Sequence, residues 1–298
     1  MAEVLFIGLS LASILLLIAL GLSITYGTMG VINMAHGELV MFGAYVTVLG
    51  ITHLHLNFFL CLPLAFIVTG AIGYAIERLL VRRLYGRLVD TLLATWGVSI
   101  ILIALIRVEF GLAFFGVHVP GLGPGLQNVP IPAILSQPVA LWEGFVFQPY
   151  RSFIIVATLG LVVLTWWILS RTAFGMQVLA VSRNRTMAAC CGINDKRVNA
   201  WTFAYGSGLA GIAGVMLSGF KTVFPDMGTP FVIDGFLVVV VGGVGSLLGT
   251  TVSSGILGEL TGFIASVTND ILARAVVFAV IIAIIITRPR GLFAFKGR

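Results

Sequence analysis

The chain has 298 residues, of which 59% are hydrophobic and only 9% are charged, and its mean hydropathy is +1.12. Soluble domains carry about 25% charged residues, so this composition excludes an ordinary water-soluble protein. The net charge of +6 would suggest nucleic acid as the partner of a soluble protein. Here the basic residues follow a membrane pattern, and no nucleic-acid partner is expected.

Apolar runs long enough to cross a bilayer recur along the whole chain. Crossing about 30 Å of hydrocarbon takes roughly 20 helical residues. The clearest runs are 4–24, 58–76, 91–106, 152–169, 200–220 and 271–287, and glycine-rich apolar stretches lie at 37–52 and 231–268. Counting the last stretch as a hairpin pair gives about nine spans. The sequence predicts an all-α polytopic integral membrane protein with eight or nine transmembrane helices, forming a single domain over residues 1–298.

Basic residues indicate the orientation, because they are retained on the cytoplasmic side of membranes. Thirteen of the seventeen fall into three clusters. The clusters are Arg78, Arg82, Arg83 and Arg87; Arg171, Arg183, Arg185, Lys196 and Arg197; and Arg288, Arg290, Lys296 and Arg298. We therefore expect an external N-terminus and a cytoplasmic C-terminus. The 109–151 segment is then an external loop with short surface helices, and 171–199 is a cytoplasmic loop.

Small residues recur at helical spacing in the second half of the chain. They form two ladders, Gly206, Ala210, Gly214 and Ser218, and Gly242, Ser246, Thr250, Ser254 and Gly258. Such faces let helices approach closely in lipid. In "FLVVVVGGVGSLLG" (236–249), Gly242, Gly243 and Gly245 predict a helix broken at membrane depth. The first half has a similar interruption after "GLSITYGTMG" (21–30), and such a pair is typical of a transport pathway and an internal repeat.

Three polar residues, Asn33, His36 and Glu38, follow the first interruption. Asn33 and His36 would share a face of a helix, whereas His36 and Glu38 point about 200° apart and cannot hold one metal ion. Polar groups inside a membrane are functional candidates by default, so these three are candidates for a translocation pathway. The alternative is that they anchor a re-entrant turn. Glu259, within a later apolar stretch, is expected to pair with a basic residue.

Motifs for catalysis, redox chemistry or ATP hydrolysis are missing. Three cysteines, including the neighbours Cys190 and Cys191, predict no disulfide framework, and four scattered histidines predict no metal site. No lysine lies in the Gly-Lys-Ser/Thr pattern of a phosphate-binding loop. The chain is therefore expected to use no cofactor and to be no enzyme. If ATP drives its action, a separate subunit must hydrolyse it.

The cytoplasmic loop "RTAFGMQVLAVSRNRTMAACCGINDKRVN" (171–199) predicts a short helix. Asn184 is a good N-cap and Gly192 is placed to end the helix. Between them, basic Arg185 precedes the soft and small residues Met187, Ala188 and Ala189. A short cationic helix with small side chains suits docking to another protein. The alternative is a solvated connector.

Several segments together resemble a known transporter family. They are "GLSITYGTMGVINMAHGELVMFGAY", "DTLLATWGVSIIL", "NRTMAACCGINDKRV", "FLVVVVGGVGSLLGT" and "RPRGLFAFKGR". They are similar to the permease subunits of branched-chain amino acid and urea ABC importers, nearly end to end except in 109–151. "ATWG", "AACCGI" and "RPRGLFAFKGR" are more similar to the urea branch.

This resemblance implies an importer in the bacterial inner (plasma) membrane. The implied partners are a periplasmic or extracellular solute-binding protein, a homologous second permease and two cytoplasmic ABC ATPases that drive alternating access. The 184–192 helix would be the coupling helix that fits the ATPase. The expected solute is urea, with branched-chain amino acids as the alternative, because the pathway carries few fixed charges. A self-sufficient channel for a small solute is the alternative from another class.

Overall fold

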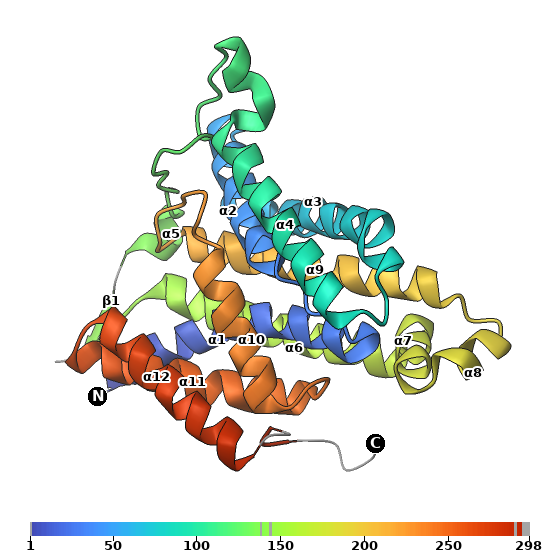
Figure 1. Cartoon of the computed structure of the whole chain (residues 1–298). Helices are drawn as coiled ribbons and strands as arrows, with labels where there is room; N and C mark the ends of the chain where they lie inside the picture. The colour runs from blue at the N-terminus through green and yellow to red at the C-terminus, as the bar shows by residue number, and fades with distance from the viewer. Residues whose placement is uncertain (1, 138, 143–144, 289–290, 294–298) are drawn as a thin grey trace.

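The computed structural model describes residues 2–137, 139–142, 145–288 and 291–293, and nearly all of them are helical (Figure 1). The main helices are α1 Ala2–Met29, α2 His36–Thr52, α3 Phe58–Leu79, α4 Leu88–Arg107, α6 Pro149–Arg171, α7 Ala173–Arg183, α9 Asp195–Ser218, α10 Thr229–Gly242, α11 Leu247–Val267 and α12 Asp270–Thr287. The short elements are η1 Val81–Arg83, η2 Glu109–Phe115, α5 Ala133–Ser136, α8 Arg185–Cys190 and an antiparallel hairpin of β1 Val139–Trp142 and β2 Phe145–Phe147.

Six of the described helices are long and apolar enough to cross a membrane, namely α1, α3, α4, α6, α9 and α11. Helices α2, α10 and α12 are apolar but shorter. This pattern confirms the predicted fold class, and the chain is a multi-pass membrane protein. The predicted boundaries were less accurate: α1 continues to Met29, and α9 begins at Asp195 rather than at residue 200.

Helix α9 lies at the centre of the bundle and is buried over most of its length. Its small residues bring other backbones into direct contact. A β-carbon at Gly206 would lie 2.7 Å from the carbonyl oxygen of Gly21 in α1, and one at Gly214 would collide with the carbonyl of Val40 in α2. Gly211 leaves similarly little room for α3, because its β-carbon would lie 2.9 Å from the carbonyl oxygen of Ala65. The first ladder therefore packs helices, as the sequence predicted.

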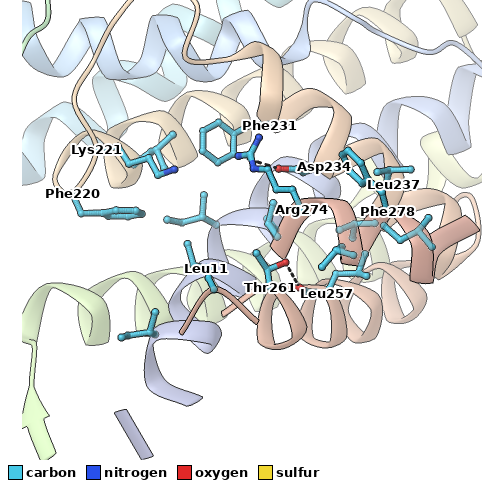
Figure 2. Close-up of a pocket in the computed structure, with 18 of the residues that line it drawn as sticks. Leu11, Phe220, Lys221, Phe231, Asp234, Leu237, Leu257, Thr261, Arg274 and Phe278 are labelled. Carbon is cyan, nitrogen blue, oxygen red and sulfur yellow. Dashed lines mark hydrogen bonds and ion pairs between the residues drawn. The ribbon is translucent and has the colours of Figure 1, made fainter. Parts of the chain in front are cut away.

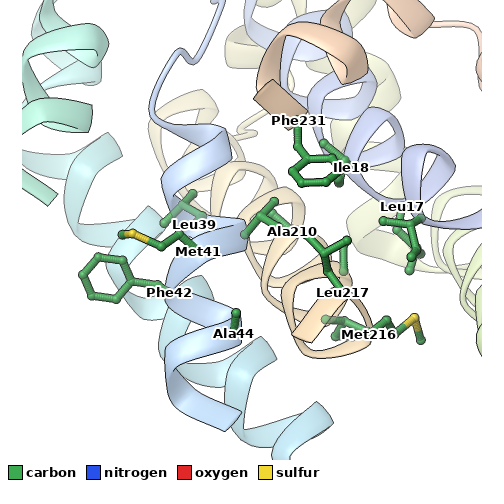
Figure 3. Packing of buried hydrophobic residues seen from close by; sticks show 14 of the residues in the cluster. Leu17, Ile18, Leu39, Met41, Phe42, Ala44, Ala210, Met216, Leu217 and Phe231 are labelled. Carbon is green, nitrogen blue, oxygen red and sulfur yellow. The ribbon is translucent and has the colours of Figure 1, made fainter. Parts of the chain in front are cut away.

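Buried hydrophobic side chains fill the space around these backbone contacts. Figure 3 shows Leu17 and Ile18 of α1 near Ala210 and Leu217 of α9, with α2 on the opposite side. Ile18, Leu17 and Ala210 are inaccessible to solvent. The core thus joins the N-terminal helices to α9, although they are far apart in the sequence.

The glycine-rich break of the second half lies between α10 and α11. Gly243 and Gly245 have φ values of 93° and 76°, which glycine adopts without the steric cost of a β-carbon. The Ser246 hydroxyl then accepts a hydrogen bond from the Gly249 amide at 3.0 Å and caps α11. Gly242 and Gly249 touch through their backbones. The second ladder therefore closes a helical hairpin.

The first two basic clusters and Arg288 of the third lie at one end of the bundle, called the basic end here; Arg290, Lys296 and Arg298 lie outside the described residues. Arg82 donates to the Lys196 carbonyl at 3.4 Å, which joins the first two clusters. Residues 291–293 are held near the glycine-rich break, where the Leu292 amide donates to the Val241 carbonyl at 2.8 Å. Gly245 at this break lies against Gly27 of α1. The side of the membrane that this end faces stays a prediction.

The opposite end, called the loop end, carries the segment between α4 and α6. This segment holds η2, α5 and the hairpin. Gln127 pairs with Val223 beyond α9, and Arg107 forms a 2.6 Å ion pair with Asp226. The Phe147 ring stacks on Phe6 near the start of α1, with centroids 6.1 Å apart. These contacts bring the segment onto the ends of α1, α4 and α9.

The packing of α9 predicts the effect of one added methyl group. Gly214→Ala should lower the free energy of unfolding by about 1–3 kcal/mol, because overpacking forces the α2 backbone away. The measurement is the thermal unfolding midpoint in detergent. Gly160→Ala in α6 is the matched control, since nothing lies within 4 Å of its added β-carbon. Equal midpoints for the two variants would contradict the role of Gly214.

Candidate functional site

The link between α1 and α2 makes few backbone hydrogen bonds, and nearby side chains satisfy some of its amides. The Asn33 Oδ1 atom accepts from the Ala35 amide at 3.1 Å, and the Thr95 hydroxyl of α4 accepts from the Met34 amide at 3.1 Å. Backbone groups released inside a membrane need such partners. Asn33 lies in this link, before α2 begins at His36. The prediction that Asn33 and His36 share a helix face was therefore wrong.

His36 is the first residue of α2 and has no exposed surface. Its Nε2 atom lies 3.1 Å from the carbonyl oxygen of Ile18 in α1. Since a carbonyl only accepts, Nε2 is the protonated ring nitrogen. Gly21 makes room for the ring, because a β-carbon there would lie 2.9 Å from the His36 Cε1 atom. His36 therefore fastens the start of α2 to the middle of α1.

Glu38 is fully buried in the first turn of α2. Its Oε1 atom accepts from the Ser99 hydroxyl of α4 at 2.9 Å and from the Thr229 hydroxyl of α10 at 3.3 Å. The backbones of Gly37 and Gly228 touch, so α10 begins beside the start of α2. Helix N-termini carry a partial positive charge that favours a carboxylate. Two such ends are the physical reason that Glu38 is tolerated here.

These residues form one junction of α1, α2, α4 and α10, which we call the polar junction (Asn33, His36, Glu38, Ser99 and Thr229) and which is buried except at Thr229. Asn33, His36 and Glu38 are each exposed by 1% or less. Asn33 Nδ2, His36 Nδ1 and Glu38 Oε2 have no hydrogen-bond partner among the described residues. The existing bonds favour anchoring in this conformation. The three remaining atoms would reach a solute only if the helices separated.

The predicted glycines of the pathway lie elsewhere. Gly242, Gly243 and Gly245 are at the basic end, whereas Glu38 contacts the other end of α10. Gly243 is covered by Gly291, whose β-carbon would lie 2.7 Å from the Gly243 Cα atom. The structure therefore does not bring the two predicted groups into one site.

Helix α8 occupies the position predicted for the coupling helix. The Asn184 Oδ1 atom accepts from the Met187 amide at 3.0 Å, and Gly192 has a φ of 80° beyond its end. Met187 and Ala189 are exposed, but Ala188 is only 4% exposed and packs in a small cluster with α7 and α9. Ala188 therefore cannot belong to a docking surface. Helix α7 was not predicted from the sequence.

A polar network at the basic end supports the start of α8. The Glu77 side chain has no exposed surface; it accepts from Arg82 at 3.1 Å and from the Tyr85 hydroxyl. The Arg185 guanidinium lies over the Tyr85 ring, 4.9 Å from its centroid. Burial, and then the Glu77 carboxylate, raise the pKa of Tyr85 above its ordinary value, so its hydroxyl remains a donor. This network, which the sequence analysis missed, links α3 to α8.

A mostly apolar cavity lies between α1, α10, α11 and α12 near the loop end (Figure 2). Four charged residues line it, Arg151, Lys221, Asp234 and Arg274. Its three basic residues stand singly in the sequence, outside the three basic clusters. Their isolation was the sequence signal that could have identified this cavity. Glu259 of α11 is not among the lining residues. We expected Glu259 to form an ion pair, and this prediction was wrong. Among the described residues Glu259 has no ion-pair partner, and its side chain packs against Gly8.

Comparison with known proteins addresses the whole chain. The family model described as the permease component of branched-chain amino acid transport systems matches residues 4–285. The chain belongs to this permease family. It is therefore a transport subunit and not an enzyme. No solved structure matches the chain.

Individual relatives agree with the family model. The chain is 31% identical to the high-affinity branched-chain amino acid transport system permease protein BraD of Pseudomonas aeruginosa, over 96% of this chain and 93% of that protein. It is 30% identical to the permease protein LivH of Escherichia coli K12, with the same coverage. A more distant relative is the permease protein LivM of the same strain, at 23% identity over 80% of this chain and 58% of that protein.

The bonds at Glu38 predict how substitutions separate anchoring from transport. Glu38→Leu should lower the free energy of unfolding by about 1–3 kcal/mol, because the buried Ser99 hydroxyl and the more exposed Thr229 hydroxyl lose their acceptor. Glu38→Gln keeps an acceptor of the same shape and should remain closer to the wild type. Thermal unfolding of the purified permease measures both. A Glu38→Leu variant as stable as the wild type would exclude anchoring.

Proposed function

We propose that the chain is a membrane-spanning subunit of an ATP-driven importer that moves branched-chain amino acids into the cytoplasm by alternating access. The observation that supports this most strongly is the family match over residues 4–285. Relatives named for branched-chain amino acid transport, at 30–31% identity over 96% of the chain, agree with it. The family match extends through the polar junction, α8 and the α10–α11 hairpin.

Urea remains a second candidate, because the short motifs "ATWG", "AACCGI" and "RPRGLFAFKGR" resemble the urea branch. The sequence favoured urea because the predicted pathway carries few fixed charges, but the structure weakens that argument. Asp234 and Arg274 line one cavity together with Lys221. An amino acid zwitterion needs partners for both of its charges, and urea needs only hydrogen-bond partners. The cavity therefore offers more charge than urea requires.

The energy source in this proposal is a pair of separate ATPase subunits. The chain has no phosphate-binding loop of the Gly-Lys-Ser/Thr type. Helix α8 supports docking by its exposed Met187 and Ala189 and by its rigid base, where Asn184 caps it and Ala188 packs inward. The remaining proposed partners are a homologous second permease and a solute-binding protein. In this arrangement the basic end faces the cytoplasm.

The solute is tested by uptake into vesicles that contain the purified complex and ATP. We expect uptake of labelled leucine that unlabelled isoleucine and valine inhibit and a large excess of urea does not. The permease without its ATPases should hydrolyse no ATP. Uptake of urea but not of leucine would establish the second candidate, and ATP-independent uptake by the single chain would establish a channel.

The orientation is tested with the native cysteines, because Cys190 and Cys191 are exposed beside α8 and Cys61 is buried. A membrane-impermeant maleimide should label the permease in inside-out vesicles and leave it unlabelled in intact spheroplasts. A variant in which serine replaces both exposed cysteines is the control and should remain unlabelled in both preparations. Labelling only in spheroplasts would reverse the proposed orientation.

The docking role of α8 is tested by adding bulk to its exposed surface. Ala189→Trp should abolish solute-stimulated ATP hydrolysis without changing the thermal midpoint of the permease, because the side chain points away from its core. Leu179→Trp in α7, at a residue that is 56% exposed, is the control for bulk at this end. Ala188→Trp should instead destabilise the permease. Normal stimulation in Ala189→Trp would show that α8 is only a connector.

A further inference from the structure

The cavity at the loop end combines a mostly apolar lining with charged residues. Its volume is about 240 Å³. Leu11 of α1, Leu237 of α10, Leu257 of α11 and Phe278 of α12 contribute to its apolar lining (Figure 2). Pockets for drug-sized ligands measure about 300–1,000 Å³. A cavity of this size and lining suits a solute as small as an aliphatic amino acid.

The charges of Asp234 and Arg274 are only loosely engaged with each other. The Asp234 Oδ2 atom lies 3.7 Å from the Arg274 Nη2 atom, which is longer than a hydrogen bond. Their side chains are 21% and 38% exposed. The Lys221 Nζ atom lies 5.4 Å from the centroid of the Phe231 ring. Ionisable groups at membrane depth are costly unless a partner or a function retains them.

Arg151 is held more firmly than Arg274. Its Nη1 atom donates to the Ser10 hydroxyl at 2.7 Å, and its Nε atom donates to Gln148 at 2.5 Å. Its guanidinium also lies 5.9 Å from the centroid of the Phe220 ring. We therefore assign Arg151 to the packing of α6 on α1. Asp234 and Arg274, whose ion pair is longer than a hydrogen bond, remain as the groups able to exchange partners.

We propose that this cavity binds a zwitterionic aliphatic amino acid through Asp234 and Arg274 during its passage through the permease. The inference rests on the proposed function and adds a site to it. The ammonium group of the ligand pairs with the Asp234 carboxylate, and its carboxylate pairs with the Arg274 guanidinium and the Lys221 ammonium. The aliphatic side chain lies against the leucines and Phe278. Entry of the ligand parts the 3.7 Å ion pair and gives each charge a new partner, so no buried charge is left unpaired.

The site makes a prediction about ligand chemistry, because it requires both charges of the zwitterion. 4-Methylpentanoate has the carboxylate and the aliphatic chain of leucine but no ammonium group. 3-Methylbutylamine has the ammonium group but no carboxylate. Both should therefore compete with leucine far more weakly than isoleucine does at the permease.

The experiment measures leucine binding to the purified permease complex without the solute-binding protein, by scintillation proximity with labelled leucine. Asp234→Asn and Arg274→Gln should each weaken binding about tenfold or more, because each removes a charge-assisted contact. Arg274→Lys keeps the positive charge and should retain part of the affinity. Glu259→Gln is the matched control, since it removes a carboxylate from α11 outside this cavity. The thermal midpoint of each variant identifies any that fails to fold.

The outcomes separate this inference from the proposed function. Leucine uptake by the wild-type complex together with unchanged leucine binding in both Asp234→Asn and Arg274→Gln would overturn the site and leave the function intact. Absence of leucine uptake by the wild-type complex would overturn the proposed function, and the site that rests on it would fall as well. A thermal midpoint raised by phosphatidylglycerol but not by leucine would show that the cavity holds a lipid. Weakened binding in both charge variants, with the control unchanged, supports the site.

Discussion

Direct contact between helix backbones is the constraint on which the rest of this structure depends. In lipid, burial of apolar side chains does not by itself favour one helix neighbour over another, so close packing must hold the bundle together. Gly206, Gly211 and Gly214 bring α9 against α1, α3 and α2. Larger residues at these positions would move the surrounding helices apart. The positions of the polar groups follow from this packing.

The polar junction depends on the same close approach. The touching backbones of Gly37 and Gly228 bring the N-terminal ends of α2 and α10 together. Only at that separation can the Thr229 hydroxyl reach Glu38. The carboxylate then compensates for two helix ends whose amides have no helical partners. A membrane-buried acid, which looks costly in the sequence, thus becomes part of the packing of two helices.

The two ends of α10 connect features that are important for the proposed transport cycle. Its first turn meets Glu38, and its last turn precedes the glycine break beside α1 and the 291–293 tail. Asp234, between them, lines the cavity. At the basic end, Glu77, Tyr85 and Arg185 link α3 to the start of α8. A shift of α8 would therefore act on the ends of α3 and α9 rather than on a loosely attached loop.

The amino-acid sequence by itself determined the membrane class, the approximate positions of the long helices, the breaks near residues 30 and 243, the grouping of basic residues and the cap of α8. Each of these depends on hydropathy, glycine or charge within one short segment. Only the tertiary structure decided that Glu38 meets Thr229, 191 positions away, that Ala188 faces inward, and that Asp234 and Arg274 share a cavity. The physical reason is that such pairings depend on the depth, tilt and rotation of each helix. These are decided by packing against neighbours and leave no periodic signal along the chain.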